Sequence, residues 1–193
     1  MELVEAAKTP DEVAMISRML GKHGGTLYAD IWNFGLQVAL RISDLLDITM
    51  AEAQTGRLTI REGKTGKPRQ IALNNKAQAI VEARHKAHPD HTYLFQVDSN
   101  RAKGKPISRI SVAKKFQEVG EIVGIKLGTH SMRKTRGWIM HSAGVSIEMI
   151  CKVLNHSSPS VTMHYIGLTQ AEVDATYEQF EIWACRYFKI ARA

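Results

Sequence analysis

Cysteine is scarce in this chain: its 193 residues include two, Cys151 and Cys185, and no Cys-x-x-C pair. Both fall in segments that we expect to be helical, so we predict reduced, packed thiols in a cytoplasmic protein, rather than a disulfide or a metal pair. Long apolar runs are also missing, and none approaches the roughly 20 residues that a membrane helix needs. The chain begins Met-Glu-Leu-Val-Glu, a short acidic segment that does not resemble a secretory signal. These absences argue against a membrane or secreted protein.

Negative charge is in deficit, with 26 Lys and Arg residues against 19 Asp and Glu, which leaves a net charge of +7. A basic domain of this size favours a polyanionic partner, most simply nucleic acid, although a merely soluble basic protein fits the charge equally well. The hydrophobic fraction of 44% and the charged fraction of 23% are ordinary for a globular protein. The length suits one domain with a good core.

Capping residues and apolar periodicity predict a mainly helical fold with a small antiparallel sheet, an α+β class. The expected helices cover residues 10–20, 26–40, 43–46, 76–87, 108–123, 129–141, 147–154, a segment that starts near 159, and the tail from 169 to 187. Alternating apolar residues predict strands over 57–61 and 70–73, with a third short strand over 92–95.

A histidine and a tyrosine stand nine positions apart in the segment Leu-Asn-His-Ser-Ser-Pro-Ser-Val-Thr-Met-His-Tyr, as His156 and Tyr165. Pro159 suits the first turn of a helix, and Ser157 or Ser158 can cap it. A tyrosine hydroxyl is a poor nucleophile at neutral pH, because its ordinary pKa is about 10. Tyr165 therefore needs positive charge and hydrogen-bond donors around it in order to attack anything.

Two upstream segments contain basic residues that could surround such a tyrosine. His130 and Arg133 are three positions apart and share one face near the start of a helix, where backbone amides favour anions. Taken alone, His130 is more readily a capping or core histidine than a functional one, but its pairing with Arg133 favours a functional role. Arg41 lies among apolar neighbours, so it is either directed into a polar site or bonded to helix-end carbonyls.

A glycine-bearing loop between the two predicted strands carries Lys64, Lys67 and Arg69. The loop is either a solvated basic turn or a finger that touches DNA and delivers one lysine to a phosphate. Its Gly-Lys-Thr-Gly sequence lacks the Gly-x-x-x-x-Gly-Lys-Ser/Thr pattern, which excludes an NTPase P-loop.

In chain order these residues are an arginine, a lysine, a His-x-x-Arg pair, a histidine and a tyrosine, and over about residues 10–170 the chain resembles the tyrosine recombinase (phage integrase) family. The resemblance implies the catalytic-domain fold of that family. Two positions depart from its usual wording, because Ala39 and Asn155 stand where glycine is frequent. Asparagine tolerates unusual backbone angles, so Asn155 can hold a turn that glycine would hold.

The resemblance implies that Tyr165 attacks a DNA phosphate, forming a 3′-phosphotyrosyl bond and freeing a 5′-hydroxyl. Arg41 and Arg133 would clamp the non-bridging oxygens and would also make the Tyr165 oxyanion easier to form. Lys64 would protonate the leaving oxygen, and His130 would assist as the base at the tyrosine.

By the same resemblance, His156 would donate a hydrogen bond to the phosphate, and Asp44 would hold Arg41 or backbone amides. We expect no metal and no other cofactor, since basic side chains do the neutralising. Further DNA contacts are expected from a basic set: Lys67, Arg69, Arg101, Lys103, Lys105 and Lys134. The expected partner is double-stranded DNA, with a role for accessory DNA-bending proteins left open.

We expect one catalytic domain over residues 1–193, with a lead over about 1–8 and a helical tail over about 168–193. The tail would pack on its own domain or, as in many members of the family, dock on a neighbouring protomer in a dimer or tetramer on DNA. We expect the usual N-terminal core-binding domain to be absent, which fits either an excised domain or a natural single-domain member. Two alternatives stay open: a non-catalytic DNA-binding regulator on the same fold, and a type IB topoisomerase that relaxes DNA.

Overall fold

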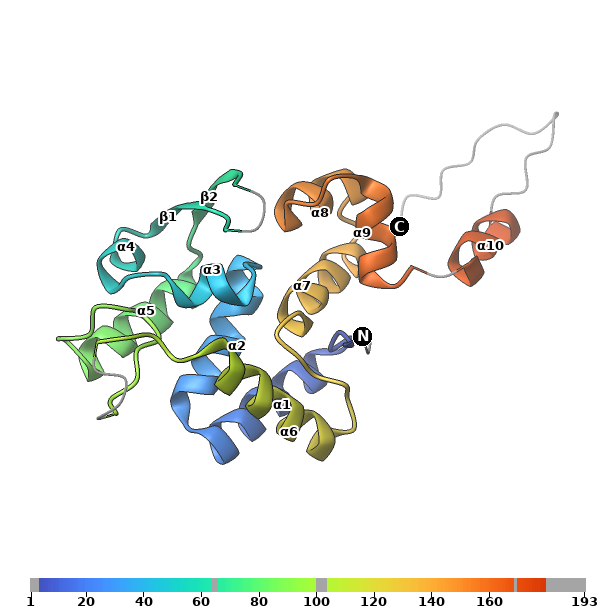
Figure 1. Ribbon diagram of the computed structural model, residues 1–193. Helices are drawn as coiled ribbons and strands as arrows, with labels where there is room; N and C mark the ends of the chain where they lie inside the picture. Colours follow the sequence, from blue (N-terminus) through green and yellow to red (C-terminus); the bar gives the residue numbers. More distant parts are fainter. Residues whose placement is uncertain (1–3, 64–65, 100–103, 169, 180–193) are drawn as a thin grey trace.

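The computed structural model describes residues 4–63, 66–99, 104–168 and 170–179, and Figure 1 shows their arrangement. The described part is mainly helical with a two-stranded antiparallel sheet, which confirms the predicted fold class. The elements in chain order are α1 (Pro10–Gly24), α2 (Thr26–Val38), α3 (Ile42–Leu46), α4 (Met50–Gln54), β1 (Arg57–Arg61), β2 (Pro68–Ala72), α5 (Asn75–Ala87), α6 (Arg109–Val123), α7 (Ser131–Ser142), α8 (Ile147–Leu154), α9 (Pro159–Ile166) and α10 (Gln170–Gln179).

Local capping sets most helix starts as expected. Ser146 caps α8 by accepting a hydrogen bond from the Met149 amide, and Ser158, rather than Ser157, caps α9 ahead of Pro159. Helix α2 ends two residues before the predicted end at Leu40, because Ala39 adopts a left-handed conformation with φ of 50°. Helix α1 continues through Gly21 to Gly24, past its predicted end.

Strands β1 and β2 pair in register from Arg57 opposite Ala72 to Arg61 opposite Pro68. The predicted third strand over 92–95 is wrong, since Tyr93 forms a single isolated bridge with Thr49. The short helix α4 was not predicted from sequence, because its single turn is too short to show a period.

The main core lies around α2, whose Trp32 and Phe34 are fully buried. Trp32 meets Phe116 of α6 edge to face, with ring centroids 5.8 Å apart. A smaller second cluster joins α8 and α9 through Ile150, Leu154 and Ile166, with Ala39 from the end of α2. The end of α2 therefore touches both groups of helices.

Helix α7 approaches its neighbours closely through two glycine contacts. Gly35 of α2 lies directly against the Met132 side chain of α7, so a Cβ at position 35 would not fit without a shift. A Cβ on Gly137 would meet Ile166 of α9 at 2.7 Å. These close contacts bring the start of α7 to the end of α2 and bring α9 alongside.

The residues before α1 are also packed. Ala7 is fully buried, and its amide donates to the Thr135 hydroxyl of α7 at 2.8 Å. Cys151 of α8 is a free, buried thiol, as predicted, while Cys185 lies outside the described residues. Figure 1 shows α10 set apart from the other helices. Within the described residues, every helix is too short or too polar to span a membrane.

Candidate active site

Arg133, in the first turn of α7, is buried between the ends of two other helices. Its guanidinium donates to the carbonyls of Ala39 and Leu154, both at 2.6 Å. At these ends the chain leaves α2 through Ala39 and α8 through Asn155, both left-handed, with φ of 50° and 52°. Asn155 thus holds the glycine-like turn that was expected of it.

Arg41 precedes α3 and pairs with the fully buried carboxylate of Glu62, which follows β1. The other carboxylate oxygen of Glu62 accepts from Arg69 of β2 at 3.1 Å. Arg69 also donates to the carbonyls of Val38 at 3.0 Å and of Val153. Its side chain is 10% exposed and lies inside this network, whereas the sequence had suggested a loop residue that contacts DNA.

Tyr165, in the last turn of α9, points at the start of α7. Its hydroxyl lies 3.3 Å from Nδ1 of His130 and donates to the His130 carbonyl at 3.4 Å. The His156 ring meets the Tyr165 ring edge to face, with centroids 4.8 Å apart. Nδ1 of His156 lies 3.0 Å from the Thr162 hydroxyl, which orients the imidazole. The structure therefore brings His130, Arg133, His156 and Tyr165 together.

Burial decides the charge state of the phenol. It raises the pKa of Tyr165, although Arg133 and Arg41 nearby act to lower it. The two arginines therefore act in the predicted direction, but burial outweighs them and the phenol stays protonated at neutral pH. Burial, with Arg133 and Arg41, lowers the pKa of His156 to about 4, so this imidazole is neutral at neutral pH.

The hairpin that carries Lys64 is attached beside Arg41, although Lys64 itself lies outside the described residues. The Gly63 amide donates to the Asp44 carboxylate at 3.0 Å. Of the two roles expected for Asp44, holding a backbone amide is the one that this contact shows. The bond attaches the residue next to Lys64 to α3.

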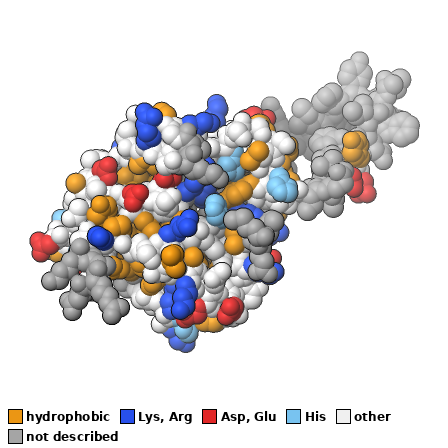
Figure 2. Space-filling view, viewed as in Figure 1, with side chains coloured by type: hydrophobic (Ala, Val, Ile, Leu, Met, Phe, Trp, Pro, Cys, Tyr) orange, Lys and Arg blue, Asp and Glu red, His pale blue; other side chains and the backbone are white. Residues whose placement is uncertain are grey.

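The other predicted DNA contacts are spread over several elements. Lys134 is half-buried, with its ammonium 5.5 Å from the centroid of the Tyr165 ring. Lys67 and Lys105 are exposed, whereas Arg101 and Lys103 lie outside the described residues. Figure 2 shows Lys, Arg and His side chains gathered near the middle of one face of the molecule.

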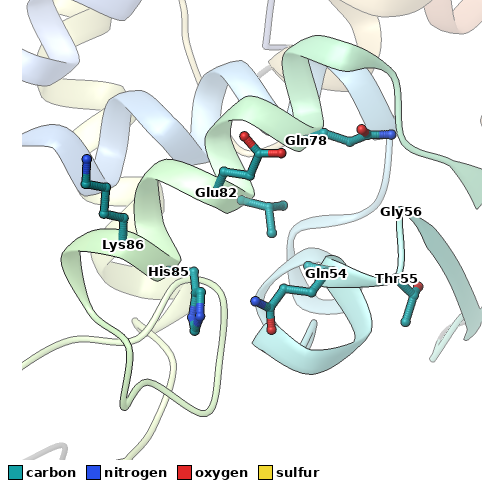
Figure 3. A pocket seen from close by; sticks show the side chains of 9 residues that line it. Gln54, Thr55, Gly56, Gln78, Glu82, His85 and Lys86 are labelled. Atoms are coloured by element: carbon teal, nitrogen blue, oxygen red, sulfur yellow. The ribbon is translucent and has the colours of Figure 1, made fainter.

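A second histidine cluster lies after α5. His88 and His91 face Asp98, with nitrogen-to-oxygen distances of 3.4 and 2.8 Å, and ligand atoms of the three lie within 4.8 Å of one another, close enough to hold a metal ion. A hollow of about 500 Å³ between α4 and α5 has Gln78, Glu82 and His85 in its wall (Figure 3). None of the predicted catalytic residues that the structure describes lines either place.

The sequence matches the phage integrase family over residues 9–172. The chain belongs to this family. A probable integrase/recombinase of Bacillus subtilis, YoeC, is 32% identical over 183 residues, which cover 93% of this chain and 98% of that protein. The tyrosine recombinase XerA of Pyrococcus furiosus is 29% identical over 143 residues, 72% of this chain and 50% of that protein. The resemblance seen in the sequence is confirmed.

Solved structures of this family share the fold. A crystal structure of XerA recombinase matches with a TM-score of 0.70 at 18% identity, covering 97% of this chain and 66% of that one. A lambda integrase dimer bound to a COC′ core site matches with a TM-score of 0.66 at 17% identity, covering 88% and 62%. The chain thus spans about half of the Pyrococcus relative and about two thirds or less of these solved chains.

Proposed function

We propose that this chain is a site-specific DNA recombinase that cuts and rejoins strands through a covalent bond to Tyr165. One observation carries the proposal: three separate helix ends bring Arg133, both histidines and Tyr165 into one cluster. The family assignment supports the same reading, since the named relatives are integrases and recombinases.

In the proposed reaction, the Tyr165 oxygen attacks a DNA phosphorus and the bond from phosphorus to the 5′-oxygen breaks. Because the pKa of Tyr165 is raised in the free protein, the phenol proton needs an acceptor. Nδ1 of His130, at 3.3 Å, is placed to accept it. Lys64 supplies a proton to the leaving 5′-oxygen, as the family resemblance implies.

Two guanidiniums neutralise the phosphate in this proposal. Arg133 uses two of its five N–H groups on carbonyls and a third on Tyr165, which leaves two that can turn to a ligand. Arg41 keeps 18% of its side chain exposed beside the pocket, so it can reach a bound phosphate. Planar, permanently charged forks suit the non-bridging oxygens.

His156 acts as a hydrogen-bond donor rather than a cation, because its pKa of about 4 leaves it neutral. The Thr162 hydroxyl can donate to Nδ1 of His156 at 3.0 Å or to the Ser158 carbonyl at 3.4 Å. Donation along the shorter contact leaves the proton of the imidazole on Nε2. That N–H is then available to the phosphate oxygen.

The phosphotyrosyl bond conserves the energy of the cleaved bond, so rejoining needs neither ATP nor, with this many basic groups, a metal. Partners follow from the same proposal. The solved lambda integrase is a dimer on its core site, which supports double-stranded DNA and a second copy of the chain as partners here. Contact between protomers through the tail after residue 168 and help from DNA-bending proteins remain proposals.

The decisive experiment incubates the protein with a pool of nicked random-sequence duplexes and isolates DNA that stays attached after denaturation. We expect an adduct with the unchanged chain and none with Tyr165→Phe. Tyr177→Phe, at a tyrosine that is 76% exposed on α10, is the matched control and should keep the adduct.

Other outcomes identify the alternatives. DNA binding without an adduct, unaffected by Tyr165→Phe, would mark a regulator. Relaxation of supercoiled DNA without joining of two marked sites would mark a topoisomerase. An adduct that survives in Tyr165→Phe would refute the assignment of the nucleophile.

A further inference from the structure

Glu62 is a fully buried acid in the middle of a basic pocket. Its side chain has no exposed surface, and its two oxygens bind different arginines, Arg41 and Arg69. A buried carboxylate is tolerated only when it is paired in this way. Sequence inspection did not select Glu62, and the family's acidic position after the first arginine is Asp44.

Arg69 extends the network to the same helix ends that hold Arg133. Arg69 donates to the Val38 and Val153 carbonyls, and Arg133 donates to the carbonyls of the next residues, Ala39 and Leu154. Glu62 therefore links Arg41 to the scaffold that fixes Arg133. Within the described part of the chain, Arg41 donates to Glu62 and to no helix-end carbonyl, so its position depends on Glu62.

The three guanidiniums repel one another. Besides burial, Arg41 lowers the pKa of both Arg69 and Arg133, while Glu62 acts to raise both values. Burial alone would raise the pKa of the Glu62 carboxyl, but hydrogen bonds from Arg41 and Arg69 hold it below its ordinary value. Glu62 therefore stays ionised at neutral pH and offsets part of the repulsion before a phosphate arrives.

We propose that Glu62 is a positioning residue for strand cleavage, which holds Arg41 at the angle that a DNA phosphate needs and counters the charge of the clustered arginines. The inference rests on the proposed function. Glu62 touches no reacting atom in this account and acts through Arg41. Removal of the carboxylate should therefore slow strand cleavage while DNA binding stays equal or becomes tighter.

The test is Glu62→Gln, which removes the charge and keeps the shape. We expect the single-turnover rate of adduct formation on saturating nicked DNA to fall about 10- to 100-fold, since a misplaced catalytic group has an effect of this size. DNA affinity at the same salt concentration should stay equal or increase, because the pocket gains one positive charge. A variant that is merely damaged would lose both, so this split separates positioning from folding.

A double-mutant cycle tests whether Glu62 acts through Arg41. In an Arg41→Gln background, Glu62→Gln should slow adduct formation by less than about 3-fold, because the coupled partner is already gone. Multiplicative losses would overturn the inference. Asp98→Asn makes the same chemical change in the other cluster and should leave the cleavage rate unchanged.

If Glu62→Gln does not fold, Glu62→Asp decides the matter. It keeps the charge but withdraws the carboxylate by one methylene, so cleavage should be slower with unchanged DNA affinity. Wild-type rates in the variant that folds would overturn the role of Glu62 while leaving the proposed function intact. Absence of any adduct with the unchanged chain would instead refute the proposed function.

Discussion

Two pairs of histidines sit in opposite electrostatic surroundings in this molecule. His130 and His156 flank Tyr165 beside buried arginines. His88 and His91 stack with ring centroids 4.3 Å apart and both face the carboxylate of Asp98. The residue types are the same, and the charge of the neighbours differs.

The difference determines what each pair can do. Burial and two arginines keep His156 neutral, with a pKa of about 4, so it can offer a hydrogen bond without adding charge. In the second pair, a nitrogen of His88 lies 3.4 Å and a nitrogen of His91 lies 2.8 Å from the carboxylate oxygens of Asp98, whose side chain is 65% exposed. A contact with an exposed carboxylate of this kind contributes little to the stability of the fold. The comparison therefore supports the proposed chemistry at the arginine-surrounded pair and gives no reason to place chemistry at the other.

Among the changes that test this comparison, the largest effect is expected from removing the proposed base. His130→Gln keeps a polar side chain but accepts no proton, so the rate of adduct formation on nicked DNA should fall about 100-fold or more. His91→Gln, the matched change in the second pair, should leave that rate unchanged. Quench-flow or gel measurement of the covalent adduct gives both rates. Equal rates for His130→Gln and the unchanged chain would show that His130 is not the base at Tyr165.

Local sequence signals were sufficient for the nucleophile segment. Ser158 and Pro159 start α9 as their capping preferences predict, and that start places Tyr165 two turns later. His130 and Arg133 also lie in neighbouring positions at the start of α7, as their spacing predicted. The order of the motif then identified the family without any tertiary information.

The ion-pair network could not be read in the same way, because its partners come from distant parts of the chain. Arg69 looked like an exposed loop residue, yet it binds carbonyls at the ends of α2 and α8. A signal for Glu62 was present. Leu58 and Ile60 alternate along β1, and Glu62, directly after the strand, continues the same inward face. An acid at an inward position must be paired, but the sequence does not say with which arginine.

A smaller effect should appear in stability at acid pH. Because burial and the arginines lower the pKa of folded His156 from 6.5 to about 4, the unfolded chain takes up a proton before the folded one does. Stability that is complete above about pH 6.5 should therefore be lost as the pH falls toward 4. Urea unfolding at pH 7 and pH 5 should show a contribution of about 1 kcal/mol after allowance for solvent screening.

His156→Asn should remove that contribution, leaving a shallower loss of stability between pH 7 and pH 5. Staying at or above pH 5 avoids the range in which Glu62, with its lowered pKa, begins to take up a proton. An equal slope in His156→Asn and the unchanged chain would show that His156 is not held neutral.

The smallest effect is expected from Asp98→Asn. With an exposed carboxylate, its loss should change the free energy of unfolding by about 0–1 kcal/mol and leave adduct formation unchanged. Chelation with EDTA should likewise leave adduct formation unchanged, because the proposed pocket neutralises the phosphate with basic side chains. A rise in melting temperature on adding Zn²⁺, lost in Asp98→Asn, would show that the second pair binds metal, unlike the role proposed for the first pair. A loss of cleavage in Asp98→Asn would instead contradict the distinction between the two histidine pairs, since both would then serve the same reaction.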